Sequence, residues 1–142
     1  MTTVNRSAIV PRSAGVMFDL VADVRSYPEF LPWCSAIEIR ERSELHLIAT
    51  IKVDFKGIRQ SFTTENRNVP GESITMSLVE GPFRHLSGTW RFEPLGTEAC
   101  KVSLHLEYQL ASRLIERIAG PAFDHIANTF VDAFVRRVES TT

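Results

Sequence analysis

The sequence CKVSLHLEYQLASRLIERIAGPAFDHIANTFVDAFVRRV occupies residues 100–138 and decides the fold. Its first part, up to Leu110, alternates apolar and polar side chains, which predicts a strand with one buried face. Its last part, from Pro121 to Val138, has apolar residues at i, i+3, i+4 and i+7. This spacing predicts an amphipathic helix of roughly 27 Å at 1.5 Å per residue. The stretch therefore joins a half-buried strand to a long helix that must cover an apolar surface.

A further helical stretch opens near Ser112, upstream of Gly120 and Pro121. Proline lacks the N–H of a helical hydrogen bond and clashes with the preceding turn, although it is accepted as the first residue of a new helix. We therefore expect a kink or a brief break at Pro121 in one C-terminal helical arm.

Strand patterns also fill the middle of the chain. Strands are expected over 45–55, over 58–68, around 74–78 and around 86–92, with turns at 56–57, 70–71, 81–82 and 94–96. Consecutive strands joined by such short turns are antiparallel. Before them, Ser13 is suited to cap a helix that we expect from Ser13 to Val24.

These elements predict an α+β domain with the order strand, helix, about six strands and long helix. A half-apolar sheet of six to seven antiparallel strands can bury its face by curving around the C-terminal helix. The 142 residues suit one domain spanning 1–142. Periodicity alone leaves two alternatives for the interior, which is either filled by side chains or open as a pocket.

Composition narrows the class of function. Sixteen basic and seventeen acidic residues give a net charge of −1, so no long-range positive field attracts nucleic acid. Two cysteines do not make a disulfide framework, and no apolar run approaches the ~20 residues of a membrane span. No signal-peptide pattern is visible at the start. We expect a soluble, cytoplasmic protein with reduced thiols.

Three stretches carry a resemblance to a known family. They are MFDLVADVRSYPEFLPWCSAIEI (17–39), EGPFRHLSGTWRFEP (80–94) and AFDHIANTFVDAFVRRV (122–138). Together they resemble the coenzyme Q-binding START-domain family, whose bacterial members are also described as ribosome-association toxins of the RatA type. The element order is similar to the helix-grip fold of the START and Bet v 1-like superfamily over essentially the whole chain.

The resemblance implies two functions, of which the first is our leading hypothesis and the second is its alternative. One is a non-catalytic carrier or chaperone for ubiquinone or a related polyprenyl lipid, held between the sheet and the C-terminal helix, with no required cofactor and with transient contact at the inner membrane. The other is a bacterial toxin that binds the large ribosomal subunit, blocks subunit association and has a small antitoxin as partner. A filled interior would contradict the carrier hypothesis. An enzyme of the cyclase type is a weaker third alternative.

Aromatic and apolar residues are the candidate ligand contacts. In the segment YPEFLPWC, they form either a lid at the pocket mouth or a plug at one end of the core. A Gly-Pro turn and the following strands supply further aromatics, and the C-terminal helix adds a stripe that is core, pocket wall or both. The candidates are Tyr27, Phe30, Leu31, Trp33, Phe83, Trp90, Phe92, Tyr108, Phe123, Phe130 and Phe134. Head-group donors could come from Arg59, Gln60, Trp90 or Tyr108.

Catalytic and metal patterns are not found in the sequence. The four histidines lack metal-ligand spacing, and nothing near Cys34 in sequence would lower the pKa of a thiol nucleophile. We therefore expect neither catalytic residues nor a metal site. Three local arginine pairs could contact phosphates, namely Arg40 with Arg42, Arg113 with Arg117 and Arg136 with Arg137, although nearby glutamates could neutralise them. The candidate contacts for ribosome binding are Arg40, Arg42, Arg136 and Arg137.

Overall fold

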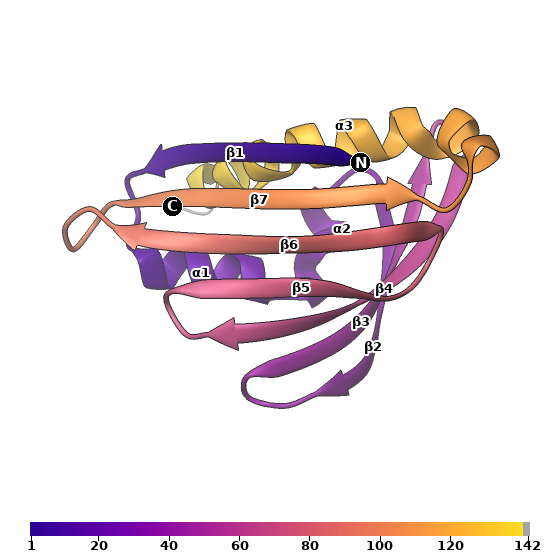
Figure 1. Ribbon diagram of the computed structural model, residues 1–142. Helices are drawn as coiled ribbons and strands as arrows, with labels where there is room; N and C mark the ends of the chain where they lie inside the picture. Colours follow the sequence, from indigo (N-terminus) through magenta and orange to yellow (C-terminus); the bar gives the residue numbers. More distant parts are fainter. Residues whose placement is uncertain (141–142) are drawn as a thin grey trace.

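A computed structural model describes residues 1–140 of the chain. Seven strands of this range form one antiparallel sheet, with a long helix packed across it (Figure 1). The elements are β1 (Thr2–Val10), α1 (Ala14–Ala22), the 3-10 turn η1 (Val24–Ser26), α2 (Tyr27–Phe30), β2 (Cys34–Arg42), β3 (His46–Phe55), β4 (Ile58–Val69), β5 (Ser73–Glu80), β6 (Phe83–Pro94), β7 (Cys100–Leu110) and α3 (Arg113–Ser140).

The sheet order is β1-β7-β6-β5-β4-β3-β2, so strands β2 to β7 form a continuous meander. The N-terminal strand closes the other edge by pairing with β7 from Thr2 opposite Tyr108 to Val10 opposite Cys100. Strands β2 to β4 turn away from the plane of β5 to β7, which gives the sheet its concave face (Figure 1). The predicted α+β class, the curved antiparallel sheet and the run of about six strands after the first helix are confirmed, although the position of β2 was not predicted.

The C-terminal helix differs from the prediction because it runs without a break from Arg113 to Ser140, with Pro121 inside it. The expected brief break at Pro121 is therefore wrong. Pro121 is exposed, so water can satisfy the Arg117 carbonyl, which has no proline N–H to accept. Packing of the flanking residues Ala119, Ala122 and Phe123 against the sheet holds the helix together on its buried side.

The first helix is shorter than expected and ends at Ala22 rather than Val24. Its predicted cap is confirmed, since the Ser13 hydroxyl accepts a hydrogen bond of 3.2 Å from the Val16 N–H. The chain then turns through η1 and the single helical turn α2, which both pack against β2. No helix within residues 1–140 is long and apolar enough to span a bilayer.

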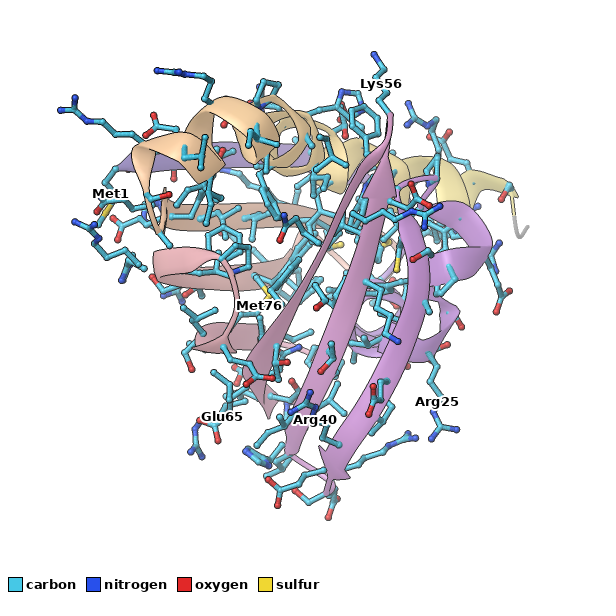
Figure 2. The ribbon with its side chains drawn as sticks, turned by 90° about the vertical axis from the view of Figure 1, so that its right-hand side faces the viewer. Met1, Arg25, Arg40, Lys56, Glu65 and Met76 are labelled. Atoms are coloured by element: carbon cyan, nitrogen blue, oxygen red, sulfur yellow. The ribbon has the colours of Figure 1, made fainter. Side chains whose placement is uncertain are left out.

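One apolar core lies between the sheet and the helices. The alternating faces predicted for β3, β6 and β7 point into it, and Trp90 of β6 and Phe134 of α3 are fully buried. Their ring centroids are 5.3 Å apart in an edge-to-face arrangement. The buried residues of the helix begin at Ala119, whereas its first turns extend beyond the Met1 end of β1 (Figures 1 and 2).

Candidate functional site

A small apolar cavity lies between α3 and the concave face of the sheet. Its volume is about 80 Å³, and its walls come from η1, α2, α3 and five strands. Gly88 on β6 is part of the wall, and a Cβ there would come within 2.7 Å of the Met76 side chain and 3.0 Å of Leu106. A side chain at this position would therefore clash with Met76 and press against Leu106, which both line the cavity. The space is several-fold smaller than the roughly 300–1,000 Å³ of typical small-molecule sites.

The structure divides the candidate ligand contacts into two groups. Six of them line the cavity: Tyr27, Trp33, Phe83, Tyr108, Phe123 and Phe130. The other five lie outside its wall and pack in the core: Phe30, Leu31, Trp90, Phe92 and Phe134. Phe134 is the centre of a cluster, with ring centroids 5.3 Å from Tyr27 and 5.1 Å from Phe30. This cluster occupies the space that a long lipid would need.

The Tyr27–Cys34 segment is packed inside the fold. Tyr27, Leu31 and Trp33 are only 5%, 1% and 3% exposed. The Tyr27 hydroxyl donates a hydrogen bond of 2.6 Å to the Val21 carbonyl, and burial raises the pKa of that hydroxyl. In this conformation the segment closes one end of the sheet, and these three side chains present almost no surface to a membrane.

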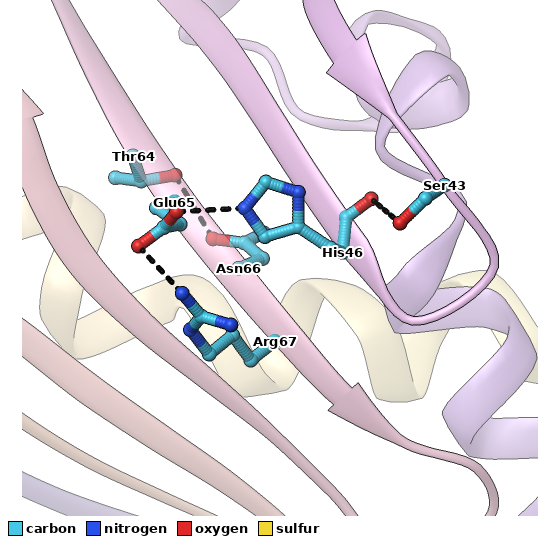
Figure 3. A network of polar contacts seen from close by, with 6 residues as sticks. All are labelled: Ser43, His46, Thr64, Glu65, Asn66 and Arg67. Atoms are coloured by element: carbon cyan, nitrogen blue, oxygen red, sulfur yellow. Dashed lines mark hydrogen bonds and ion pairs between the residues drawn. The ribbon is translucent and has the colours of Figure 1, made fainter.

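The cavity has a polar corner on β4, whose residues were not predicted as ligand contacts from the sequence. Thr64 and Asn66 are buried on its wall, and the Thr64 hydroxyl donates a hydrogen bond of 3.0 Å to Asn66 Oδ1 (Figure 3). The Asn66 amide N–H group has no hydrogen-bond partner within residues 1–140, so it can donate to a molecule in the cavity. The signal in the sequence was the TTEN run at 63–66, whose polar residues break the apolar alternation.

Tyr108 forms a second polar boundary of the cavity. It also lines an outer depression beside α3, where its hydroxyl donates a hydrogen bond to Asp124. Burial, followed by this hydrogen bond, raises the pKa of Tyr108. The other three candidate head-group donors do not reach the cavity, because Arg59 and Gln60 line a separate outer groove and Trp90 is enclosed in the core.

A groove of about 590 Å³ lies on the surface next to the cavity, with Val24 shared between them. Arg25 from η1 and Arg42 from the end of β2 both line it, and neither forms an ion pair within residues 1–140. The carboxylates of Asp19, Asp23 and Glu44 line the same groove. Asn68 Oδ1, also on this wall, is buried and has no hydrogen-bond partner within the described part of the chain. We call this region the arginine groove.

A hydrogen-bonded network on β3 and β4 borders the arginine groove. His46 Nε2 lies 2.7 Å from Glu65 Oε2, and Arg67 lies 3.5 Å from the other Glu65 oxygen (Figure 3). The hydrogen bond to His46, followed by the Arg67 charge, lowers the pKa of Glu65. The Ser43 hydroxyl, at the β2–β3 turn, donates to the His46 carbonyl. The network fixes the positions of β2, β3 and β4 at the rim of the groove.

The four arginines predicted to contact phosphate differ in their surroundings. Arg40 pairs with Glu80 at 3.2 Å, and Arg137 pairs with Glu29 at 3.0 Å while stacking over Phe30. Arg42 and Arg136 have no ion pair among residues 1–140. Neighbouring acids thus neutralise one member of each pair, and phosphate binding by the other member stays a prediction.

The thiols show no sign of activation. Cys34 and Cys100 are both free and buried. Burial raises the pKa of Cys34 to about 11 and also raises that of Cys100. Residues 1–140 contain no group of three or more His, Cys, Asp or Glu side chains that could hold a metal ion.

Fold and sequence together place the chain in a family. The model of the polyketide cyclase, dehydrase and lipid transport family matches residues 10–135, and the chain belongs to this family. Its structure is also similar to a START superfamily protein from Mycobacterium smegmatis, with a TM-score of 0.77, 23% identity and coverage of 99% of both chains. At this identity the similarity shows the fold alone.

Relatives that match nearly the whole of this chain have names that are more specific than the family description. The chain is 49% identical over 98% of its length to "Ribosome association toxin RatA" of Vibrio cholerae, covering 96% of that protein. A protein of the same name in Escherichia coli is 42% identical over 98% of this chain and 88% of its own. "Coenzyme Q-binding protein COQ10 homolog B, mitochondrial" of Xenopus laevis is 26% identical over 94% of this chain and 56% of its own.

Proposed function

We propose that this protein associates with the large ribosomal subunit through its surface and blocks subunit association. The observation that carries the proposal is the 42–49% identity, over 97–98% of the chain, to proteins named as ribosome association toxins. The sizes of the two spaces agree with a surface role, because the interior keeps only about 80 Å³ whereas the arginine groove offers about 590 Å³. Its two arginines have no ion pair within residues 1–140, although Asp19, Asp23 and Glu44 also line the groove.

Arg25 and Arg42 are the proposed phosphate contacts in the arginine groove, and Arg136 on α3 is a further one. A guanidinium without a carboxylate partner can form paired hydrogen bonds to a phosphate of RNA without first breaking an ion pair. Arg40 and Arg137 would have to give up Glu80 and Glu29. Variants of Arg25 and Arg42 therefore test the proposal more cleanly than variants of the paired residues.

The experiment is co-sedimentation of the purified protein with isolated large and small ribosomal subunits at several salt concentrations. The protein should sediment with the large subunit, and binding by the double variant Arg25→Glu/Arg42→Glu should be weaker. The slope of log K against log salt should fall by about 2, one for each lost phosphate contact. Arg91→Glu, an exposed arginine on β6 without an ion pair within 1–140, is the matched control. Equal binding to both subunits, or no binding, contradicts the proposal.

Binding of an apolar ligand in the cavity is the second candidate, and the donor on Asn66 favours it. A ubiquinone or another polyprenyl lipid would require the aromatic cluster around Phe134 to move, since about 80 Å³ does not hold an isoprenoid chain. Mass spectrometry of a solvent extract of the native protein tests this function. Ala127→Leu, which adds three carbons to the cavity wall, is the control that should lose any bound lipid.

A cyclase-type enzyme has the least support. An aromatase/cyclase from a Streptomyces strain has a TM-score of 0.80 with 20% identity, which shows a shared fold rather than a shared activity. The cavity wall is mostly apolar, and Thr64, Asn66 and Tyr108 are among its few polar side chains. Our proposal therefore assigns no catalytic residue. It includes a small antitoxin protein as a partner and a peripheral location at the inner membrane as two further parts.

A further inference from the structure

The first turns of α3 carry two exposed aliphatic side chains. Leu114 and Ile118 lie four residues apart, on one face of the helix, and are 64% and 53% exposed. The start of this helix is held rigidly, because the Ser112 hydroxyl caps the Ile115 N–H at 3.1 Å and Arg84 donates to the Ala111 carbonyl at 3.2 Å. These two side chains therefore project from a fixed platform rather than from a flexible tail.

Two arginines flank the aliphatic pair. Arg113 and Arg117 are also four residues apart, and they line the outer depression of about 610 Å³. Neither forms an ion pair within residues 1–140. Glu116 lines the same depression, whereas Asp124 accepts the hydrogen bond from Tyr108. We name the surface formed by Arg113, Leu114, Arg117 and Ile118 the α3 ridge.

A phospholipid surface satisfies both kinds of side chain at once. Exposed aliphatic groups gain free energy by entering the boundary between head groups and acyl chains, and arginines can extend their stems to reach the lipid phosphates. Ribosomal RNA would satisfy the arginines but would leave Leu114 and Ile118 against charged sugar-phosphate. A small anion would fit the depression but would not cover the ridge. The combination favours a membrane surface over both.

The position of the ridge adds to this argument. Tyr108 lines both the outer depression and the interior cavity. A membrane bound at the ridge would therefore lie next to a residue of the cavity wall. Met1, which lines this depression, and Arg25, which lines the arginine groove, lie on opposite sides of the molecule (Figure 2). We propose that the α3 ridge docks the protein on phospholipid bilayers, independently of the arginine groove.

The test is co-sedimentation of the full chain with vesicles of phosphatidylcholine alone and of phosphatidylcholine with phosphatidylglycerol. Binding should be stronger to the anionic vesicles. Arg113→Gln/Arg117→Gln should weaken binding to these vesicles roughly 30-fold, from about 1 kcal/mol for each arginine near an anionic surface. Leu114→Gln/Ile118→Gln, which keeps good helix formers, should weaken binding to both kinds of vesicle.

Controls separate this inference from the proposed function. Ile9→Thr changes an aliphatic residue that is 72% exposed on β1, and Arg25→Gln/Arg42→Gln changes the arginine groove. Both should bind vesicles like the wild type, and circular dichroism should show that all variants fold. No vesicle binding by the wild-type chain overturns the inference. Ridge variants that bind vesicles normally but lose the ribosomal subunit also overturn it and assign the ridge to RNA.

Discussion

The interior cavity and the arginine groove are neighbours that share Val24, yet they are built in opposite ways. The cavity keeps about 80 Å³ because aromatic rings from α2, β6 and α3 fill the rest of the concave face. The groove has about 590 Å³ and two arginines without ion pairs in residues 1–140. A fold able to enclose a ligand can therefore fill most of its interior with packed side chains, and here the larger open space lies on the surface.

The largest expected effect comes from removing the packed part of the interior. Trp90→Ala should lower the free energy of unfolding by about 3–5 kcal/mol, because Trp90 is fully buried against Phe134. Urea unfolding measures this change. Leu45→Ala, at an exposed residue just before β3, should stay within about 0.5 kcal/mol. A Trp90 variant that loses less than about 1 kcal/mol would show that this region is loosely packed and able to open.

A smaller effect is expected at the polar corner of the cavity. Asn66→Leu leaves the buried Thr64 hydroxyl without its acceptor and should cost about 1–3 kcal/mol. The double variant Thr64→Val/Asn66→Leu removes both partners and should recover most of this loss. Urea denaturation of the wild type, of Asn66→Leu, of Thr64→Val and of the double variant completes a double-mutant cycle. If the double variant is no more stable than Asn66→Leu, the pair is not a structural hydrogen bond of the apo protein.

The smallest effect concerns the network at the rim of the groove. The pKa of Glu65 lies below its ordinary value of 4.5, so the ionised form is favoured in the folded state. This contribution to stability is complete above pH 4.5 and disappears as the pH falls through the lowered pKa of Glu65. The stability difference between the wild type and Glu65→Gln should therefore be largest near neutral pH and shrink in acid. Glu98→Gln, in the β6–β7 turn, is the control, and a difference that grows in acid contradicts the assignment.

Sequence periodicity predicted the sheet and both main helices because each buries one continuous face. The β7 alternation from Cys100 to Leu110 is nearly free of exceptions, and all but one of its apolar-phase side chains are buried. A kink or a brief break at Pro121 was predicted from local chemistry, and the break is wrong because tertiary packing of Phe123 and its neighbours holds the helix in one piece. Local rules therefore fail where burial on the opposite face of the helix outweighs one lost hydrogen bond.

The candidate site was only partly predictable. Aromatic content identified the wall residues Tyr27 and Phe130, but it could not separate them from the fully packed Phe134, since all three follow apolar patterns. The grouping of Arg25 with Arg42 depends on η1 lying beside the end of β2, which spacing in sequence does not encode. Likewise, the pairing of Arg40 with Glu80 joins residues on β2 and β5.

The most direct test of the central claim compares a filled interior with an altered surface in one assay, the formation of whole ribosomes from separated subunits. Our account predicts that Ala127→Leu, which fills the cavity, blocks subunit association as well as the wild type does. It also predicts that Arg25→Glu/Arg42→Glu has lost most of that inhibition. The reverse result, inhibition lost with Ala127→Leu and kept with the arginine variant, would contradict the account and assign the function to the interior.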